Sequence, residues 1–202
     1  MVTPTERELG LLLGLTVLGL LVTAYHPFDT LTWFLEVAPV LVAIPVLAAT
    51  RRGFPLTRLV YWLIGLHALV LMIGGHYTYA RVPLGFWLQD WMDFSRNHYD
   101  RLGHLMQGFV PAMIAREVLL RRTLLVRGKM LFFLVICVAA FISVVYEFIE
   151  WWAALISSEA AESFLGTQGD NWDTQWDMFI CLCGATAAQW LLHRVHDRQL
   201  GA

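Results

Sequence analysis

The sequence predicts an all-α protein: one polytopic membrane helix bundle with six transmembrane helices and both termini in the cytoplasm. The first observation is composition. Of 202 residues, 58% are hydrophobic and only 15% are charged, and the mean hydropathy is +0.59, whereas about a quarter of a soluble chain is charged. The second is that the apolar residues form long runs. The third is that the basic residues gather in alternate connections between those runs.

Six apolar runs are long enough to cross a hydrocarbon layer of about 30 Å at about 1.5 Å per residue. The predicted spans are residues 8–25, 31–49, 58–77, 98–120, 129–150 and 174–193. The first run is expected to stay as a helix, because its start, "MVTPTERE", is not basic and "VTAYHPF" offers no signal-peptide cleavage pattern. The six spans make a single integral-membrane domain over residues 1–202.

The basic residues predict the orientation, because Lys and Arg are enriched in cytoplasmic loops. Ten of the fourteen fall at one face: Arg7, Arg51, Arg52, Arg58, Arg121, Arg122, Arg127, Lys129, Arg194 and Arg198. Seven of nine tryptophans fall at the other, as in an interfacial belt: Trp33, Trp87, Trp91, Trp151, Trp152, Trp172 and Trp176. We therefore expect a multi-pass protein of a bacterial inner membrane, surrounded by lipid. In the connection at 78–97, "RVPLGFWLQDWMDFSRN" predicts a short interfacial helix.

Several polar residues have ordinary structural explanations. Asp29 and Glu36 are predicted to cap the second span, and Asp170 or Asp173 taken alone is equally well explained as a cap of the sixth. Arg116 and Glu117 predict a charge cluster at the cytoplasmic end. The net charge of −2 gives no reason to expect a nucleic-acid partner. The three cysteines lie inside apolar runs, which is typical of packing residues.

Polar side chains recur at helical spacing at the same end of the last three spans. The three trios are Asp100, His104 and Gln107; Ser143, Glu147 and Glu150; and Asp170, Thr174 and Asp177, with Asp173 beside the last. Each trio occupies an arc of about 60° on its helix. Ionisable side chains that face lipid are costly, so we expect one shared cluster inside the bundle. Arg101 is the only fixed cation expected near it, and His76 and His67 of the third span are further candidate members.

This cluster predicts either metal binding or acid–base chemistry, because so many carboxylates need a compensating cation or must stay partly protonated. The expected metal ligands are His104, Glu147, Glu150, Asp170, Asp173 and Asp177. The expected catalytic residues are Asp100, His104, Glu147, Glu150 and Asp177. Oxygen-rich ligands favour Mg²⁺, Mn²⁺ or Ca²⁺, with iron or zinc as alternatives. The sequence contains neither an HExxH motif nor a serine nucleophile elbow.

Three strings carry a family resemblance: "HYDRLGHLMQGFVPAMIAREVLLR", "YEFIEWWAA" and "FLGTQGDNWDTQWDM". In this order they closely resemble the YjdF-like family of bacterial inner-membrane proteins, which implies a polytopic membrane protein and supplies no activity. A weaker resemblance is to the VanZ-like family, through Asp100-Arg101 with His104, Glu147 with Glu150, and Asp177 with Cys181 and Gly184. Glu150 stands where that family has an amide, and Cys181 where it has Asn. This second likeness implies work at the cell envelope.

Three functions are left open by the residues. The first is a membrane-embedded, metal-dependent hydrolase or transferase that acts on an amphiphilic or lipid-linked envelope substrate at the outer leaflet. The second is a non-catalytic protein whose polar cluster is structural or binds a cation. The third is a small ion-coupled transporter that uses protonatable carboxylates as a relay. A closed, fully hydrogen-bonded cluster would favour the second, and a polar path towards Arg116 and Glu117 would favour the third.

Overall fold

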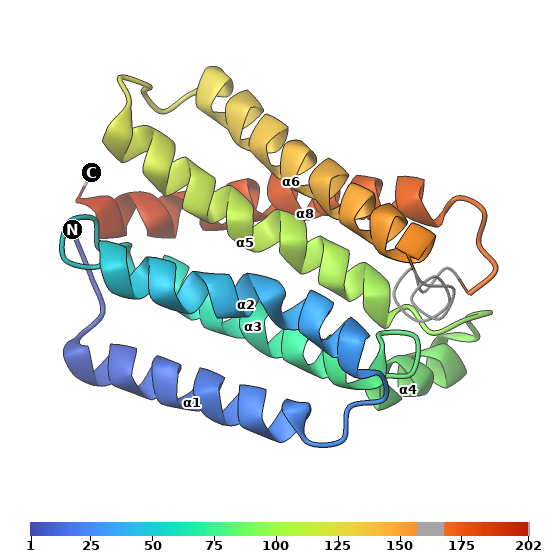
Figure 1. Ribbon diagram of the computed structural model, residues 1–202. Coiled ribbons are helices and arrows are strands. Elements are labelled where there is room, and N and C mark those ends of the chain that lie inside the picture. The colour runs from blue at the N-terminus through green and yellow to red at the C-terminus, as the bar shows by residue number, and fades with distance from the viewer. Residues whose placement is uncertain (157–167, 202) are drawn as a thin grey trace.

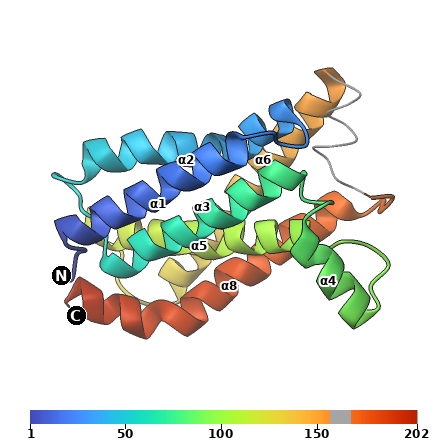
Figure 2. The same cartoon turned by 90° about the horizontal axis from the view of Figure 1, so that it is seen from below.

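Long helices run side by side in a bundle, with a short helix at one end (Figures 1 and 2). The structure is a computed structural model that describes residues 1–156 and 168–201. Within these ranges the helices are α1 Glu6–Ala24, α2 Thr30–Thr50, α3 Arg58–Tyr77, α4 Pro83–Met92, α5 Tyr99–Arg122, α6 Lys129–Ile156 and α8 Asp173–Leu200, and there is no strand. The two termini meet at one end (Figure 1), where the Val2 N–H donates to the Gln199 carbonyl at 2.6 Å.

The predicted all-helical class is confirmed for the described residues, but the predicted number of membrane crossings is not. Of the described helices, α1, α2, α3, α6 and α8 are long and apolar enough to cross a membrane. Helix α5 has 24 residues and lies among them, but it is less apolar and does not belong to that group. Six crossings and cytoplasmic termini therefore stay predictions.

The predicted boundaries agree with the helices to within a few residues at most ends. Helix α3 coincides with the predicted 58–77, and α4 is the short helix expected within 78–97. Helices α6 and α8 run to residues 156 and 200, beyond the predicted ends at 150 and 193. Residues 157–167 of the predicted connection at 151–173 lie outside the described residues.

Local side chains explain where the first two helices begin. Thr5 and Glu8 form a capping box at α1, in which each side chain accepts from the other's backbone N–H. Asp29 caps α2 by accepting from the Thr32 N–H at 2.6 Å, as predicted. The predicted capping role of Glu36 is wrong, because this residue lies two turns inside α2 and has no free helix-end amide to accept from.

Helix α5 is the centre of the bundle and packs most extensively on α8. Two glycines allow this close approach. A Cβ at Gly108 would overlap the Cys181 carbonyl oxygen of α8, and a Cβ at Gly184 would overlap the Leu105 carbonyl oxygen of α5. Such small residues let membrane helices pack backbone to backbone. The contact brings the first half of α5 against the first half of α8.

A set of buried and partly buried polar side chains, here called the terminal network, joins α5 and α8 at the end that carries the termini. Its members are Thr57, Arg116, Glu117, Arg121, His196 and Asp197. Glu117 is fully buried and accepts from the Thr57 N–H at 2.9 Å, from Arg121 at 2.6 Å and from His196 at 3.0 Å. Arg116 donates to His196 Nδ1 at 2.6 Å and to Asp197 at 2.8 Å. This is the charge cluster predicted around Arg116 and Glu117.

An apolar layer separates the terminal network from the opposite end of the bundle. It includes Val110, Ala112, Met113, Val135, Ala139, Ala185 and Ala188, each at most 1% exposed. Helix α1 contributes no buried residue and packs at the periphery against α3. A cavity of about 530 Å³, lined mainly by apolar side chains, lies between α1, α2, α3 and α5.

Candidate functional site

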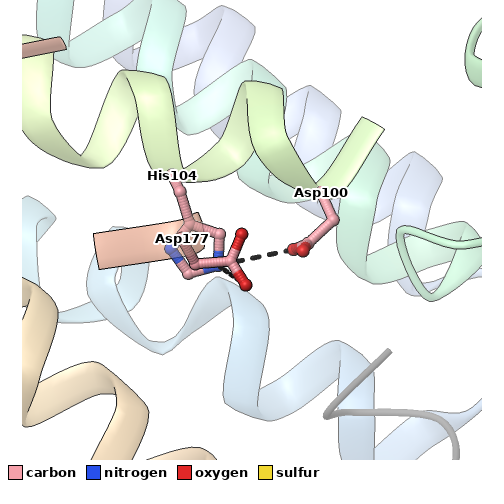
Figure 3. A group of neighbouring side chains, drawn as sticks. All are labelled: Asp100, His104 and Asp177. Atoms are coloured by element: carbon pink, nitrogen blue, oxygen red, sulfur yellow. Dashed lines mark ion pairs between the residues drawn. The ribbon is translucent and has the colours of Figure 1, made fainter. Parts of the chain in front are cut away.

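Asp100, His104 and Asp177 converge at the end of the bundle opposite the termini (Figure 3). Each offers one ligand atom, and the three atoms lie within 4.8 Å of one another. His104 Nε2 is 3.5 Å from Asp100 Oδ1 and 3.9 Å from Asp177 Oδ2. Asp100 and His104 stand one turn apart on α5, so their side chains share a face, and the α5–α8 contact brings Asp177 to them.

Helix α6 adds two carboxylates to this group. Glu147 Oε1 lies 3.9 Å from His104 Nδ1, on the other side of the imidazole ring from Asp100 and Asp177. Glu150 is one turn further along α6, within electrostatic reach of His104 and Glu147. We call Asp100, His104, Glu147, Glu150 and Asp177 the carboxylate cluster. The structure thus brings together all five residues expected to be catalytic.

The carboxylate cluster is buried but poorly hydrogen-bonded. His104, Glu147, Glu150 and Asp177 are between 2% and 7% exposed. Neither oxygen of Glu147 accepts a well-formed hydrogen bond from the described residues, although the Thr174 hydroxyl lies nearby, and Asp177 Oδ1 also has no such donor. The closest polar neighbours of His104 are the Gln107 side-chain oxygen, 3.2 Å from Nδ1, and Asp100 Oδ1, 3.5 Å from Nε2. Buried carboxylate oxygens normally have donors, so these are available to a ligand.

Two of the six predicted metal ligands face arginines. Asp170 is 3.0 Å from Arg101, and Asp173 pairs with Arg96. The expectation that Arg101 is the only nearby fixed cation is wrong, because Arg96 reaches the site from the connection before α5, whose path the sequence pattern does not define. The Trp172 N–H, followed by the two arginines, lowers the pKa of the Asp170 carboxyl from its usual range.

A second layer on α2 and α6 was not predicted. The Tyr146 hydroxyl donates to Glu36 at 2.8 Å, and the Tyr146 ring meets the His104 imidazole edge-on at 6.3 Å between centroids. Glu36 is 4% exposed. The signal that marks it is a lone carboxylate inside the apolar string "WFLEVAPVL". It therefore belongs behind the carboxylate cluster and not at a helix end.

The two histidines of α3 do not join the carboxylate cluster. His76 bonds through Nδ1 to the Thr23 carbonyl at 2.9 Å, next to α1. His67 lines the apolar cavity, and its Nε2 has no hydrogen-bond partner among the described residues. Spacing along α3 could not reveal this, because it does not say which neighbouring helix each face meets.

The fold and site together define a multi-helix membrane protein with a buried carboxylate cluster near one end. The family model described as "Predicted membrane protein (DUF2238)" matches residues 9–198. The chain belongs to this family. It is 56% identical over 182 residues to the Inner membrane protein YjdF of Escherichia coli (strain K12), covering 90% of this chain and 87% of that protein. No solved structure matches the chain significantly. These findings confirm the resemblance carried by the three motifs and put the chain among inner-membrane proteins.

Proposed function

We propose that this membrane protein is a metal-dependent hydrolase or transferase that acts on an amphiphilic or lipid-linked substrate of the cell envelope. Asp100, His104 and Asp177 hold a divalent cation, and Glu147 and Glu150 complete or adjust the site. The observation that carries the proposal is the convergence of three ligand atoms within 4.8 Å beside buried carboxylate oxygens that lack donors.

The ligand spacing suits a metal ion. Ligands about 2.0–2.5 Å from a cation lie roughly 3–4 Å from one another, and His104 Nε2 is 3.5 Å from Asp100 Oδ1 and 3.9 Å from Asp177 Oδ2. Oxygen ligands with a single imidazole favour Mg²⁺, Mn²⁺ or Ca²⁺. Such a cation supplies a polarised water as nucleophile. Glu147, next to His104 and with the Thr174 hydroxyl as its neighbouring donor, is then the candidate base.

Two observations favour this function over the alternatives. A purely structural cluster would satisfy its buried carboxylates, as the terminal network does, but Glu147 and Asp177 are left with open oxygens. A transporter would need polar groups along its path. Here the layer around Val110 and Met113 separates the cluster from the terminal network within the described residues.

The surroundings support an amphiphilic substrate. Trp87, Trp91, Trp151 and Trp172 lie at the end that carries the cluster, and each is more than half exposed. Tryptophans favour the headgroup level of a bilayer, so the site is expected near that level. The basic residues at the opposite end support a cytoplasmic position for the termini, and thus a cluster at the outer leaflet.

The test is metal content and thermal stability of the detergent-purified protein. We expect near-stoichiometric divalent metal in the wild type, and a stabilisation of about 2–3 kcal/mol when metal is restored after chelation at roughly a hundred times its dissociation constant. Asp177→Asn should lose both. Asp90→Asn, which removes the same charge from an exposed position on α4, should keep both.

Two outcomes would contradict the metal centre. If Asp177→Asn and Asp90→Asn retain metal equally, the metal is not bound at the cluster. If the wild type binds no divalent cation and Asp177→Asn is less stable than the wild type, the cluster is a structural polar network. A wild type that loads with metal then merits a screen for hydrolysis of lipid-linked envelope substrates.

A further inference from the structure

Two arginines lie beside the carboxylate cluster, and both meet the same partly buried loop carboxylate. Arg101 is 3.0 Å from Asp170 Oδ2, and Arg96 is 3.9 Å from that atom while it pairs closely with Asp173. The side chains of Arg96 and Arg101 are only 9% and 18% exposed. Two largely buried guanidinium groups that face one carboxylate make a pocket of positive charge.

Asp170 and Asp173 both contact the two arginines, but they differ in their position along the chain and in the exposure of their side chains. Asp173 begins α8 and its side chain is 5% exposed, whereas Asp170 lies in the loop before α8 and its side chain is 26% exposed. One oxygen of Asp170 accepts from Arg101, and the other accepts from the Trp172 N–H at 2.9 Å. A carboxylate with both oxygens held in this way takes the place that an external anion would take at these donors.

Arg101 keeps donor capacity that Asp170 does not use. Its Nε is buried and has no hydrogen-bond partner among the described residues. A guanidinium has five N–H donors arranged for two parallel bonds to a carboxylate or phosphate. A tetrahedral phosphoryl group offers more acceptors than one carboxylate and would engage Arg101 more completely. The Trp176 ring, 5.2 Å from the guanidinium carbon of Arg101, packs against the same group.

We propose that Arg96, Arg101 and the Trp172 N–H form a binding site for the phosphoryl group of a membrane-interface ligand, and that the Asp170 side chain occupies this site until the ligand displaces it. This inference rests on the proposed function in one respect: the ligand is taken to be the substrate. Arg101 follows Asp100 directly and precedes His104 by three residues, and Asp173 stands one turn before Asp177. A phosphoryl group at the arginines would therefore lie about one helical turn, roughly 5–6 Å, from the predicted metal ligands. A cation beside arginines is the usual arrangement for stabilising phosphoryl charge.

The test measures binding of inorganic phosphate and of a short-chain phosphatidic acid to the detergent-purified full chain, with chelator present so that no divalent cation contributes. Arg101→Gln should weaken binding roughly tenfold or more. Arg81→Gln is the control, because Arg81 carries the same charge at the same end but lies over the Phe28 ring, and it should keep wild-type affinity. Asp170→Asn should tighten binding several-fold, because it neutralises the competing carboxylate, while Asp90→Asn should not.

The expected gain of phosphate affinity in Asp170→Asn cannot be explained by misfolding, because a misfolded protein would not bind phosphate more tightly. Equal losses in Arg101→Gln and Arg81→Gln, or unchanged binding in Asp170→Asn, would overturn the proposal. Tighter binding of phosphatidic acid than of phosphate identifies a lipid headgroup as the source, and equal binding identifies free phosphate; both support the site. If Asp177→Asn still binds phosphate in the presence of chelator, the phosphoryl site is independent of the metal centre. If the wild type binds divalent metal but no phosphate, the phosphoryl site is overturned and the proposed metal centre still stands.

Discussion

The terminal network and the carboxylate cluster both join α5 to α8, the cluster with two further carboxylates from α6, yet they differ in charge balance. In the terminal network, two carboxylates, Glu117 and Asp197, meet Arg116 and Arg121, and the exposed Arg127 pairs with Asp197 from outside the network. In the carboxylate cluster, four carboxylates surround one imidazole, and the two nearby arginines pair with Asp170 and Asp173. Every buried side-chain N or O atom of the terminal network has a hydrogen-bond partner, whereas three carboxylate oxygens of the cluster accept no well-formed hydrogen bond from the described residues.

This difference teaches how to separate a structural polar group from a functional one in a membrane helix bundle. Burial alone marks both regions, because any ionisable side chain here must avoid lipid. Hydrogen bonding distinguishes them, since a network that only holds helices together is selected to satisfy its buried atoms. Buried polar atoms that lack hydrogen-bond partners are concentrated at functional sites, such as those that bind a ligand. Four experiments test the distinction.

The largest effect is expected from Glu117→Gln. This change leaves His196, Arg121 and the Thr57 N–H without their shared acceptor charge, and breaking a buried pair of this kind costs about 3–5 kcal/mol. Thermal unfolding in detergent measures the loss. Glu6→Gln is the matched control, because Glu6 pairs with Arg51 at an exposed position where an ion pair contributes at most about 1 kcal/mol. Equal losses in the two variants would show that the terminal network does not stabilise the bundle.

Much of this architecture could be predicted from the sequence. Apolar run length gave the helices, because a hydrocarbon layer fixes how many residues a span needs. The coincident spacing of Asp100 with His104, of Glu147 with Glu150, and of Asp177 on the next helix predicted the cluster, because a helix places residues three and four apart on one face.

The remaining contacts depend on loop paths and helix neighbours, which periodicity does not encode. Arg96 reaches Asp173 from the connection between α4 and α5, whose path the sequence pattern does not define. Glu36 joins through Tyr146, a contact that requires α2 to lie opposite α6. His76 turns towards α1 because α3 lies between α1 and α5, with one face for each.

The next largest effect is expected from Gly184→Ala, which asks whether both regions depend on the same helix contact. A methyl group there meets the α5 backbone, and overpacking of this kind costs about 1–3 kcal/mol. Gly14→Ala is the control, because nothing lies within 4 Å of a Cβ at that helical position, and it should be neutral or stabilising by up to about 1 kcal/mol. We expect Gly184→Ala to lower both unfolding temperature and metal content. Unchanged metal content would show that the cluster does not depend on close α5–α8 packing.

A smaller effect on stability is expected from Glu147→Gln, and this variant gives the sharpest contrast with Glu117→Gln. The substitution is the same as at Glu117, but here it removes a negative charge from among other carboxylates, and Thr174 is the nearby hydroxyl donor affected. The metal-free protein should change by less than about 1 kcal/mol or become more stable. The chelated and metal-restored proteins are compared by thermal unfolding, and metal-dependent stabilisation should fall. A metal-free loss as large as that of Glu117→Gln would remove the distinction between the two regions.

The smallest effect concerns acid stability and tests the boundary of the carboxylate cluster. The Trp172 N–H, Arg96 and Arg101 lower the pKa of Asp170 in the folded protein. A lowered folded pKa adds stability that is complete above the ordinary aspartate pKa of about 4 and is lost as the pH falls through the lowered value. Asp170→Asn should therefore flatten the stability profile below about pH 4, and Arg101→Gln should produce part of the same change. Unfolding temperatures measured across this range check it. A wild-type profile in Asp170→Asn would show that Asp170 makes no ion pair with the arginines in solution, and that their positive charge is then open to an external anion.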